Sequence, residues 1–139
     1  MVRVSARAAP MAARYNVEVP SFLALNSESD LDAVMAASHT EPVILFKHSQ
    51  TCGVSLMARD VMSDSELPAP VHEVVVQRHR DVSQAIATRL SVRHESPQVF
   101  VVARGVAVWH SSHNGVRPER ITAAWLDAAA SFTAPAAVR

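Results

Sequence analysis

The chain is poor in cysteine. Cysteine occurs once in the 139 residues, at Cys52, so no disulfide can form within the chain. This excludes a disulfide-stapled secreted scaffold and predicts a protein of the reducing cytoplasm. It also excludes a dithiol mechanism. Redox chemistry at Cys52 must therefore be an exchange with a thiol or disulfide of another molecule.

The chain also lacks an excess of charge of either sign and a long apolar run. It has 13 basic and 13 acidic residues, a formal net charge of +0 and only 5% aromatic residues. Without a basic patch carrying interleaved aromatics, we expect no nucleic-acid partner. No apolar run approaches the roughly 20 residues of a membrane span, so we expect a soluble protein that does not bind membranes. Hydrophobic residues make up 49%, which suits one globular domain.

The two ends of the chain look unlike the middle. Residues 1–17 contain three arginines and no acidic residue, and they lack the apolar core of a secretory signal. We expect a disordered tail there, or a true start at Met11, and a targeting role stays open. Residues 133–139 are rich in alanine and proline and are expected to fray. The predicted domain is therefore 18–132.

Hydrophobic periodicity predicts alternating helices and strands. Residues 22–25 (FLAL) are either an edge strand or the lead-in to a helix. Ser27 and Asp30 resemble a capping box, which would begin a helix that ends near Ser38. The later elements that we expect are a buried strand over 42–47, a helix over 54–64, a strand over 72–77, a helix over 81–90, strands over 98–103 and 106–110, and a helix that begins near 118.

This order of elements predicts an α/β fold. Alternating strands and helices imply parallel pairing with right-handed crossovers. The dipeptide Arg104-Gly105 predicts a tight turn between the last two strands, which adds an antiparallel hairpin. We therefore expect a central four-stranded mixed sheet with helices on both faces.

Cys52 lies where the first buried strand turns into a helix. A helix N-terminus has free N–H groups and positive partial charge, which favour a thiolate. Lys47 and His48 would add positive charge if they point toward the sulfur. Gly53 would let a substrate approach closely, and Ser55 could donate a hydrogen bond to the sulfur or cap the helix. The alternative is that Cys52 is a small buried hydrophobic residue, but its neighbours are polar or small and suit an exposed turn.

Histidines supply further candidates. His94 and Glu95 precede a proline and could orient a substrate or form a hydrogen-bond network with Ser112 and His113. His110 and His113 have the spacing of two ligands of a metal site. On a strand, however, they point to opposite faces, and no third ligand is evident. We expect no metal site. A basic cluster at 78–80 is either a solvated loop or a contact for an acidic thiol.

Three blocks of sequence resemble one known family. They are F-K-H-S-x-T-C-x-x-S at 46–55, V-R-H-E-S-P-Q at 92–98 and W-H-x-S-H at 109–113. Together with segments between them, they resemble the monothiol bacilliredoxin (YtxJ-like) family over roughly residues 20–127. The resemblance implies a thioredoxin-like fold. It also implies that Cys52 is the nucleophile that removes bacillithiol, a low-molecular-weight thiol, from S-thiolated client proteins.

The resemblance also implies the rest of the site. Pro97 would be the cis-proline that faces the active site, and the backbone of Ser96 would contact the bound disulfide. No cofactor would be bound, and bacillithiol or another low-molecular-weight thiol would be the co-substrate. The residues expected to bind the substrate are Lys47, His48, Thr51, Gly53, Ser55, Ser96 and Pro97, supported by His94, Glu95, Ser112 and His113.

One residue departs from the family pattern. The family motif is usually T-C-P-[IV]-S, whereas this chain has glycine at position 53. Gly53 makes the motif more similar to the C-G-F-S of monothiol glutaredoxins, which carry iron–sulfur clusters. Asn114 also stands where an aromatic residue is expected. An iron–sulfur carrier is therefore an alternative, and so is a non-catalytic thioredoxin-fold module with a stress or adaptor role.

Overall fold

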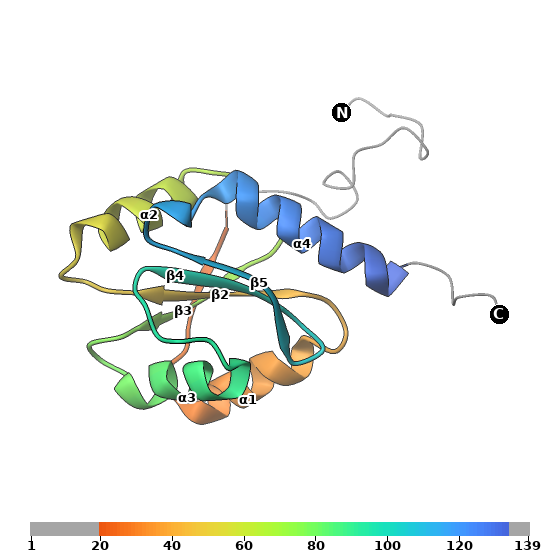
Figure 1. Ribbon diagram of the computed structural model, residues 1–139, viewed down its shortest axis with the longest axis horizontal. Helices are drawn as coiled ribbons and strands as arrows, with labels where there is room; N and C mark the ends of the chain where they lie inside the picture. The colour runs from red at the N-terminus through yellow and green to blue at the C-terminus, as the bar shows by residue number, and fades with distance from the viewer. Residues whose placement is uncertain (1–19, 134–139) are drawn as a thin grey trace.

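The computed structural model describes residues 20–133. The predicted tail at 1–17 and residues 134–139 lie outside this range. In chain order the elements are β1 (Phe22–Ala24), α1 (Glu28–Ala37), β2 (Val43–His48), α2 (Gly53–Ser63), β3 (Val71–Val75), α3 (Arg80–Leu90), β4 (Gln98–Ala103), β5 (Val106–Ser112), the short 3-10 helix η2 (His113–Gly115) and α4 (Pro118–Thr133). Helices α1 and α3 lie on one side of the sheet, and α2 and α4 lie on the other (Figure 1).

The sheet has five strands in the order β1-β3-β2-β4-β5. Strands β1, β3 and β2 are parallel, whereas β4 is antiparallel to both β2 and β5. The predicted α/β fold with a mixed sheet is confirmed, but the sheet is one strand wider than expected. The added strand is β1, so of the two alternatives for residues 22–25 the edge strand is correct. Three residues are too few for periodicity to decide between them.

Strand β2 divides the core into two halves. Ile44 and Phe46 pack in the cluster that contains α2 and α4, whereas Val43 and Leu45 pack in the cluster that contains α1 and α3. This follows from the alternation of side chains along a strand. By the same alternation, Lys47 and His48, the last two residues of β2, face opposite helical layers. The layer that each one faces decides what it can contact.

Two local predictions are confirmed at atomic detail. Ser27 is the N-cap of α1, and its Oγ accepts a hydrogen bond of 3.0 Å from the N–H of Asp30. The Asp30 carboxylate reaches back to the N–H of Asn26, at 2.8 Å. The turn between β4 and β5 has positive φ angles at both Arg104 (52°) and Gly105 (77°). Two positive φ angles are what a two-residue hairpin turn of type I′ requires.

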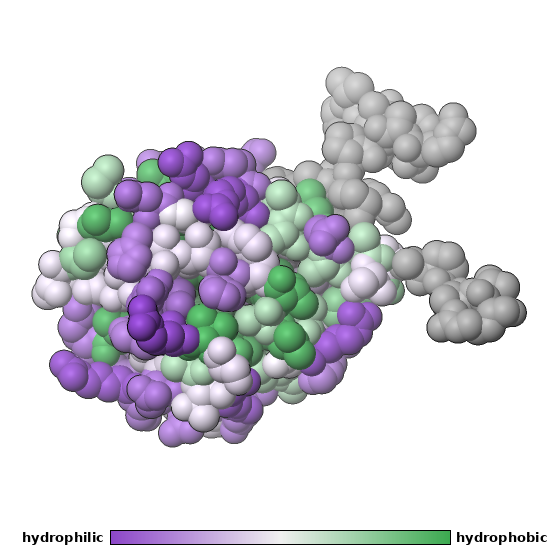
Figure 2. All heavy atoms as spheres, in the orientation of Figure 1, coloured by the Kyte–Doolittle hydropathy of each residue, from purple (hydrophilic) through white to green (hydrophobic). Residues whose placement is uncertain are grey.

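Apolar side chains are exposed along β5, the edge strand next to α4. Val106 is 59% exposed and Val108 is 51% exposed. Figure 2 shows apolar residues gathered on this part of the face, next to α4, among polar ones. Within residues 20–133, no helix is both long and apolar enough to cross a membrane.

Candidate active site

Cys52 is the N-cap residue of α2, directly after the loop that follows β2. Its backbone is extended (φ −107°, ψ 120°), and its carbonyl accepts the first helical hydrogen bond, 3.0 Å from the N–H of Leu56. The residue is partly exposed, and within residues 20–133 its side chain forms no hydrogen bond. The sulfur therefore lies at an accessible helix N-terminus, as the strand-to-helix position predicts, and Cys52 is not an enclosed core residue.

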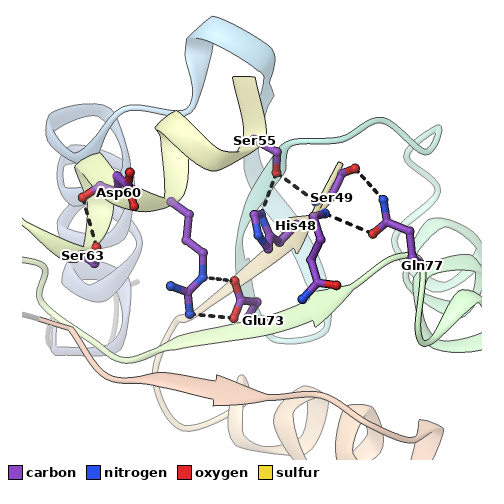
Figure 3. Close-up of polar contacts among 9 residues, drawn as sticks. His48, Ser49, Ser55, Asp60, Ser63, Glu73 and Gln77 are labelled. Atoms are coloured by element: carbon purple, nitrogen blue, oxygen red, sulfur yellow. Dashed lines mark hydrogen bonds and ion pairs between the residues drawn. The ribbon is translucent and has the colours of Figure 1, made fainter. Parts of the chain in front are cut away.

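Ser55 connects the cysteine loop to the sheet. Its Oγ accepts a hydrogen bond of 2.9 Å from the N–H of Ser49 and lies 2.8 Å from Nδ1 of His48 (Figure 3). The hydroxyl has one proton and two lone pairs, so after accepting from Ser49 it can still donate to His48 Nδ1 or accept from it, and the tautomer of His48 sets the direction. Ser55 is fully buried. Within residues 20–133 its hydroxyl bonds only these two groups, so it does not make the hydrogen bond to the sulfur that was one of its two expected roles.

Removing the Ser55 hydroxyl is expected to destabilise the fold. Ser55→Ala leaves the buried N–H of Ser49 and Nδ1 of His48 without their partner, at an expected cost of about 1–3 kcal/mol. Denaturant unfolding measures the difference. Ser63→Ala in the same helix is the matched control, because that hydroxyl bonds an exposed carbonyl, that of Asp60 (Figure 3), and should cost less than about 0.5 kcal/mol. Equal costs for the two variants would contradict the buried network.

A glutamine that sequence reasoning missed holds the loop before the cysteine. Gln77 Nε2 donates to Oγ of Ser49 at 2.7 Å and to Oγ1 of Thr51 at 3.1 Å. Its Oε1 accepts from the N–H of Gln50 at 3.2 Å. One side chain therefore fixes three consecutive loop residues, as Figure 3 shows for Ser49. The only signal in the sequence is a polar residue at the end of an apolar run, which gives no hint of the partner.

Lys47 is a buried cation. It has no exposed surface, and its Nζ lies 3.1 Å from Nδ1 of His94 and 5.9 Å from the ring centre of Phe100. Burial lowers the pKa of Lys47 from 10.5 to about 8. The ammonium therefore stays mostly charged at neutral pH. It faces α3, on the side of the sheet opposite to His48.

His48 lies under α2. It stacks on Phe46 with 5.7 Å between ring centres, and burial lowers its pKa. The charge of Glu73 partly opposes that shift. Glu73 itself is held by Arg59 through two hydrogen bonds of 2.6 and 3.1 Å (Figure 3). Burial favours the neutral imidazole, which can form its hydrogen bond with Ser55 in either tautomer.

The loop before β4 lies at the same end of the sheet as the cysteine loop, because Lys47 of β2 pairs with Gln98 of β4. The Ser96–Pro97 peptide bond is cis. Gln98 is buried and supports this loop, accepting from the N–H of Glu95 at 3.2 Å and donating to the carbonyl of Arg93 at 3.0 Å.

The predicted network among the four supporting residues forms only in part. Ser112 donates to the Glu95 carboxylate, and this hydrogen bond is the main reason why the pKa of Glu95 is lowered. Nδ1 of His113 lies 3.9 Å from the same carboxylate. His94 does not join them. It turns to the other side of the loop and contacts Lys47 and Ser83.

The predicted substrate-binding residues therefore separate into two groups. Lys47, His48 and Ser55 are buried and support the site from below, so they offer no surface to a client protein. This corrects their expected role as substrate contacts. Those with exposed or half-exposed surface are Thr51, Gly53 and Ser96, and Pro97 is buried beside Ser96.

The glycine that departs from the family motif is not required by packing. A Cβ atom added to Gly53 would have no neighbour within 4 Å. The extended backbone of Cys52 is also the conformation that a residue before proline prefers. The structure at this position would therefore accept the usual proline. Among residues 20–133, no three His, Cys, Asp or Glu side chains are grouped to hold a metal ion.

Comparison with known proteins agrees with this geometry. The family model of monothiol bacilliredoxin BrxC matches residues 23–121. The chain belongs to this family. It is 29% identical to a solved protein described as a candidate oxidoreductase with a thioredoxin fold, with a TM-score of 0.65 over 74% of this chain and 92% of the other. These findings make the chain a thioredoxin-fold redox protein of the bacilliredoxin family.

Two thioredoxins share the fold at lower identity. A thioredoxin variant from Halobacterium salinarum NRC-1 is 22% identical, with a TM-score of 0.57 over 88% of this chain and 99% of the other. The thioredoxin of Malassezia sympodialis is 17% identical, with a TM-score of 0.59 over 81% of this chain and 94% of the other. The predicted thioredoxin-like fold is confirmed.

Proposed function

We propose that the protein is a monothiol oxidoreductase that removes bacillithiol from S-thiolated proteins. The observation that carries the proposal is the position of Cys52. It is partly exposed at the N-terminus of α2, and the chain has no second cysteine to form an internal disulfide. Membership of the bacilliredoxin family supports the choice of substrate.

In the first step, the Cys52 thiolate attacks the sulfur of the small thiol in the client's mixed disulfide. The S–S bond of the client breaks, a new S–S bond forms between Cys52 and the small thiol, and the client cysteine leaves as a thiolate. The free N–H groups at the start of α2 favour the negative charge on the attacking sulfur. Gln77, Ser55 and the loop that they fix keep Cys52 at the helix end.

In the second step, a thiolate from another molecule regenerates the protein. A second low-molecular-weight thiol attacks the small thiol's sulfur, forms a disulfide with it and releases Cys52 as a thiolate. Over the two steps the disulfide passes from the client to a pair of small thiols: one of them leaves the client, and the other, which enters as a free thiol, is the reductant. No bound cofactor is needed. We also place the reaction in the cytoplasm, where a lone cysteine stays reduced.

Mass spectrometry of the intermediate tests this proposal. Mixing the reduced protein with a bacillithiolated client should add the mass of one bacillithiol to the peptide containing Cys52 and remove it from the client. Adding free bacillithiol should then restore the unmodified peptide. If the client keeps its modification, or if the protein and client become joined in a lasting disulfide, the proposal is wrong. An iron–sulfur carrier would instead bind a coloured cluster during anaerobic reconstitution.

A further inference from the structure

A hollow of about 550 Å³ lies beside the cysteine loop, and the proposed exchange at Cys52 makes no use of it. Its wall includes Ser49 from the loop, Ser96 next to the cis peptide bond, and Gln77. Ser49 also accepts from the N–H of Cys52, at 3.5 Å. A small molecule attached to Cys52 would therefore have this hollow as its neighbour.

The first turn of α3 forms another part of the wall. Arg80, Asp81 and Ser83 line the hollow. The N-cap of α3 is His79, and its side chain makes no capping hydrogen bond. The free N–H groups of the first turn thus have no side-chain cap, and the positive end of the helix faces the hollow.

A buried cation stands behind the same wall. His94 and Ser83 line the hollow, and Nδ1 of His94 lies 3.1 Å from Lys47 Nζ and 3.3 Å from Ser83 Oγ. An ammonium can only donate, so His94 Nδ1 accepts and its ring proton is on Nε2. The imidazole is therefore neutral, and its single N–H, on Nε2, can be offered to a ligand.

The charges around the hollow do not all balance. No carboxylate among residues 20–133 forms an ion pair with Lys47. At the surface Arg80 and Asp81 offset each other, since both are exposed. The Glu95 carboxylate, which acts on His94, is paired with Arg93 at 3.8 Å. The buried Lys47 ammonium then leaves the wall with net positive charge, and a buried charge is screened by salt far less than an exposed one.

We propose that this hollow is an anion subsite that binds a carboxylate of the small thiol during exchange at Cys52. The inference rests on the proposed function, because the thiol is the molecule that Cys52 brings there. The buried Lys47 ammonium attracts the carboxylate electrostatically without touching it and holds His94, so it is a positioning residue. The groups that face the carboxylate are Ser83, the His94 Nε2–H and the first-turn N–H groups of α3. The subsite makes the protein selective for acidic thiols.

A matched pair of substrates tests the selectivity. One client protein is modified with glutathione, which carries two carboxylates, or with glutathione diethyl ester, which carries none. The ratio of kcat/KM for the acid to that for the ester is the readout, because a merely structural change in a variant affects both substrates. We expect a ratio of about 10 for the wild type and below about 2 for Lys47→Met. Asp81→Asn, which removes a negative charge at the rim, should raise the ratio.

Two variants make the result specific. Arg80→Gln is a surface change and should lower the ratio without any change in the core. Arg89→Gln, in the last turn of α3 where it pairs with Asp32, should leave the ratio as in the wild type. A wild-type ratio near 1, or a ratio that Lys47→Met does not lower, overturns the subsite.

A binding experiment separates this inference from the proposed function. A client modified with mercaptoethanol, which is neutral, reports exchange at Cys52 alone, and no release from it would contradict the proposed function. S-methylglutathione cannot exchange disulfides, so it tests the subsite even then. In NMR titration it should shift the His94 ring signals and the amides of the first turn of α3, and Lys47→Met should remove these shifts. Shifts that are absent in the wild type, or that its diethyl ester causes equally, overturn the subsite.

Discussion

Cys52→Ser is expected to reduce the release of bacillithiol from a modified client to the uncatalysed rate. A serine hydroxyl cannot form a disulfide, so the mixed-disulfide intermediate does not exist in this variant. No other thiol can replace it, since Cys52 is the only cysteine of the chain. The expected loss is therefore complete within the sensitivity of the assay, which follows free thiol over time.

The same variant should keep its stability. Cys52 is partly exposed, and within the described part of the chain its side chain forms no hydrogen bond, so its replacement leaves no buried group without a partner. We expect thermal unfolding to agree with the wild type within about 0.5 kcal/mol. This separates loss of chemistry from loss of fold. Release that survives in Cys52→Ser would show that another group reacts and that the proposed mechanism is wrong.

The parts of the fold that depend on neighbouring residues could be predicted from the sequence. The cap at Ser27 and the turn at Arg104-Gly105 follow from residues within three positions of each other. The strand over 98–103 was predicted with the bounds of β4, because a run of buried β-branched residues between proline and glycine has few alternatives. Cys52 was placed correctly for the same reason, at a boundary between two clear patterns.

The support beneath the site could not be predicted, because it depends on which elements pack together. Alternation along β2 predicts that Lys47 and His48 point in opposite directions, but not that α3 covers one and α2 the other. The contacts of Lys47 with His94 and of Ser49 with Gln77 join residues 47 and 28 positions apart. Several partners suit each polar side chain at that distance, and only the tertiary fold selects one.

Lys47→Met is expected to raise the free energy of unfolding at pH 7 by about 2–3 kcal/mol. The pKa of Lys47 is about 8 in the folded protein and 10.5 when the side chain is not buried, as in the unfolded chain. At a pH where Lys47 is protonated in both the folded and the unfolded state, this difference corresponds to about 3 kcal/mol of destabilisation of the fold. Methionine fills a similar volume without a charge. The lost hydrogen bond to His94 reduces the gain slightly. Chemical denaturation at pH 7 measures the change.

The pH dependence identifies the cause of this gain. Between about pH 8 and 10.5 the unfolded wild type still binds the Lys47 proton while the folded state has released it, so the stability of the wild type rises with pH. Lys47→Met has no such group, so the two stability curves should differ most below pH 8 and converge above about 10.5. Both proteins should carry Cys52→Ser, so that the reactive thiol takes no part in the comparison. Arg89→Met, an exposed change, should run parallel to the wild type. A constant gap for Lys47→Met at all pH values would mean that packing causes the gain, and that the ammonium is not the buried charge on which the anion subsite depends.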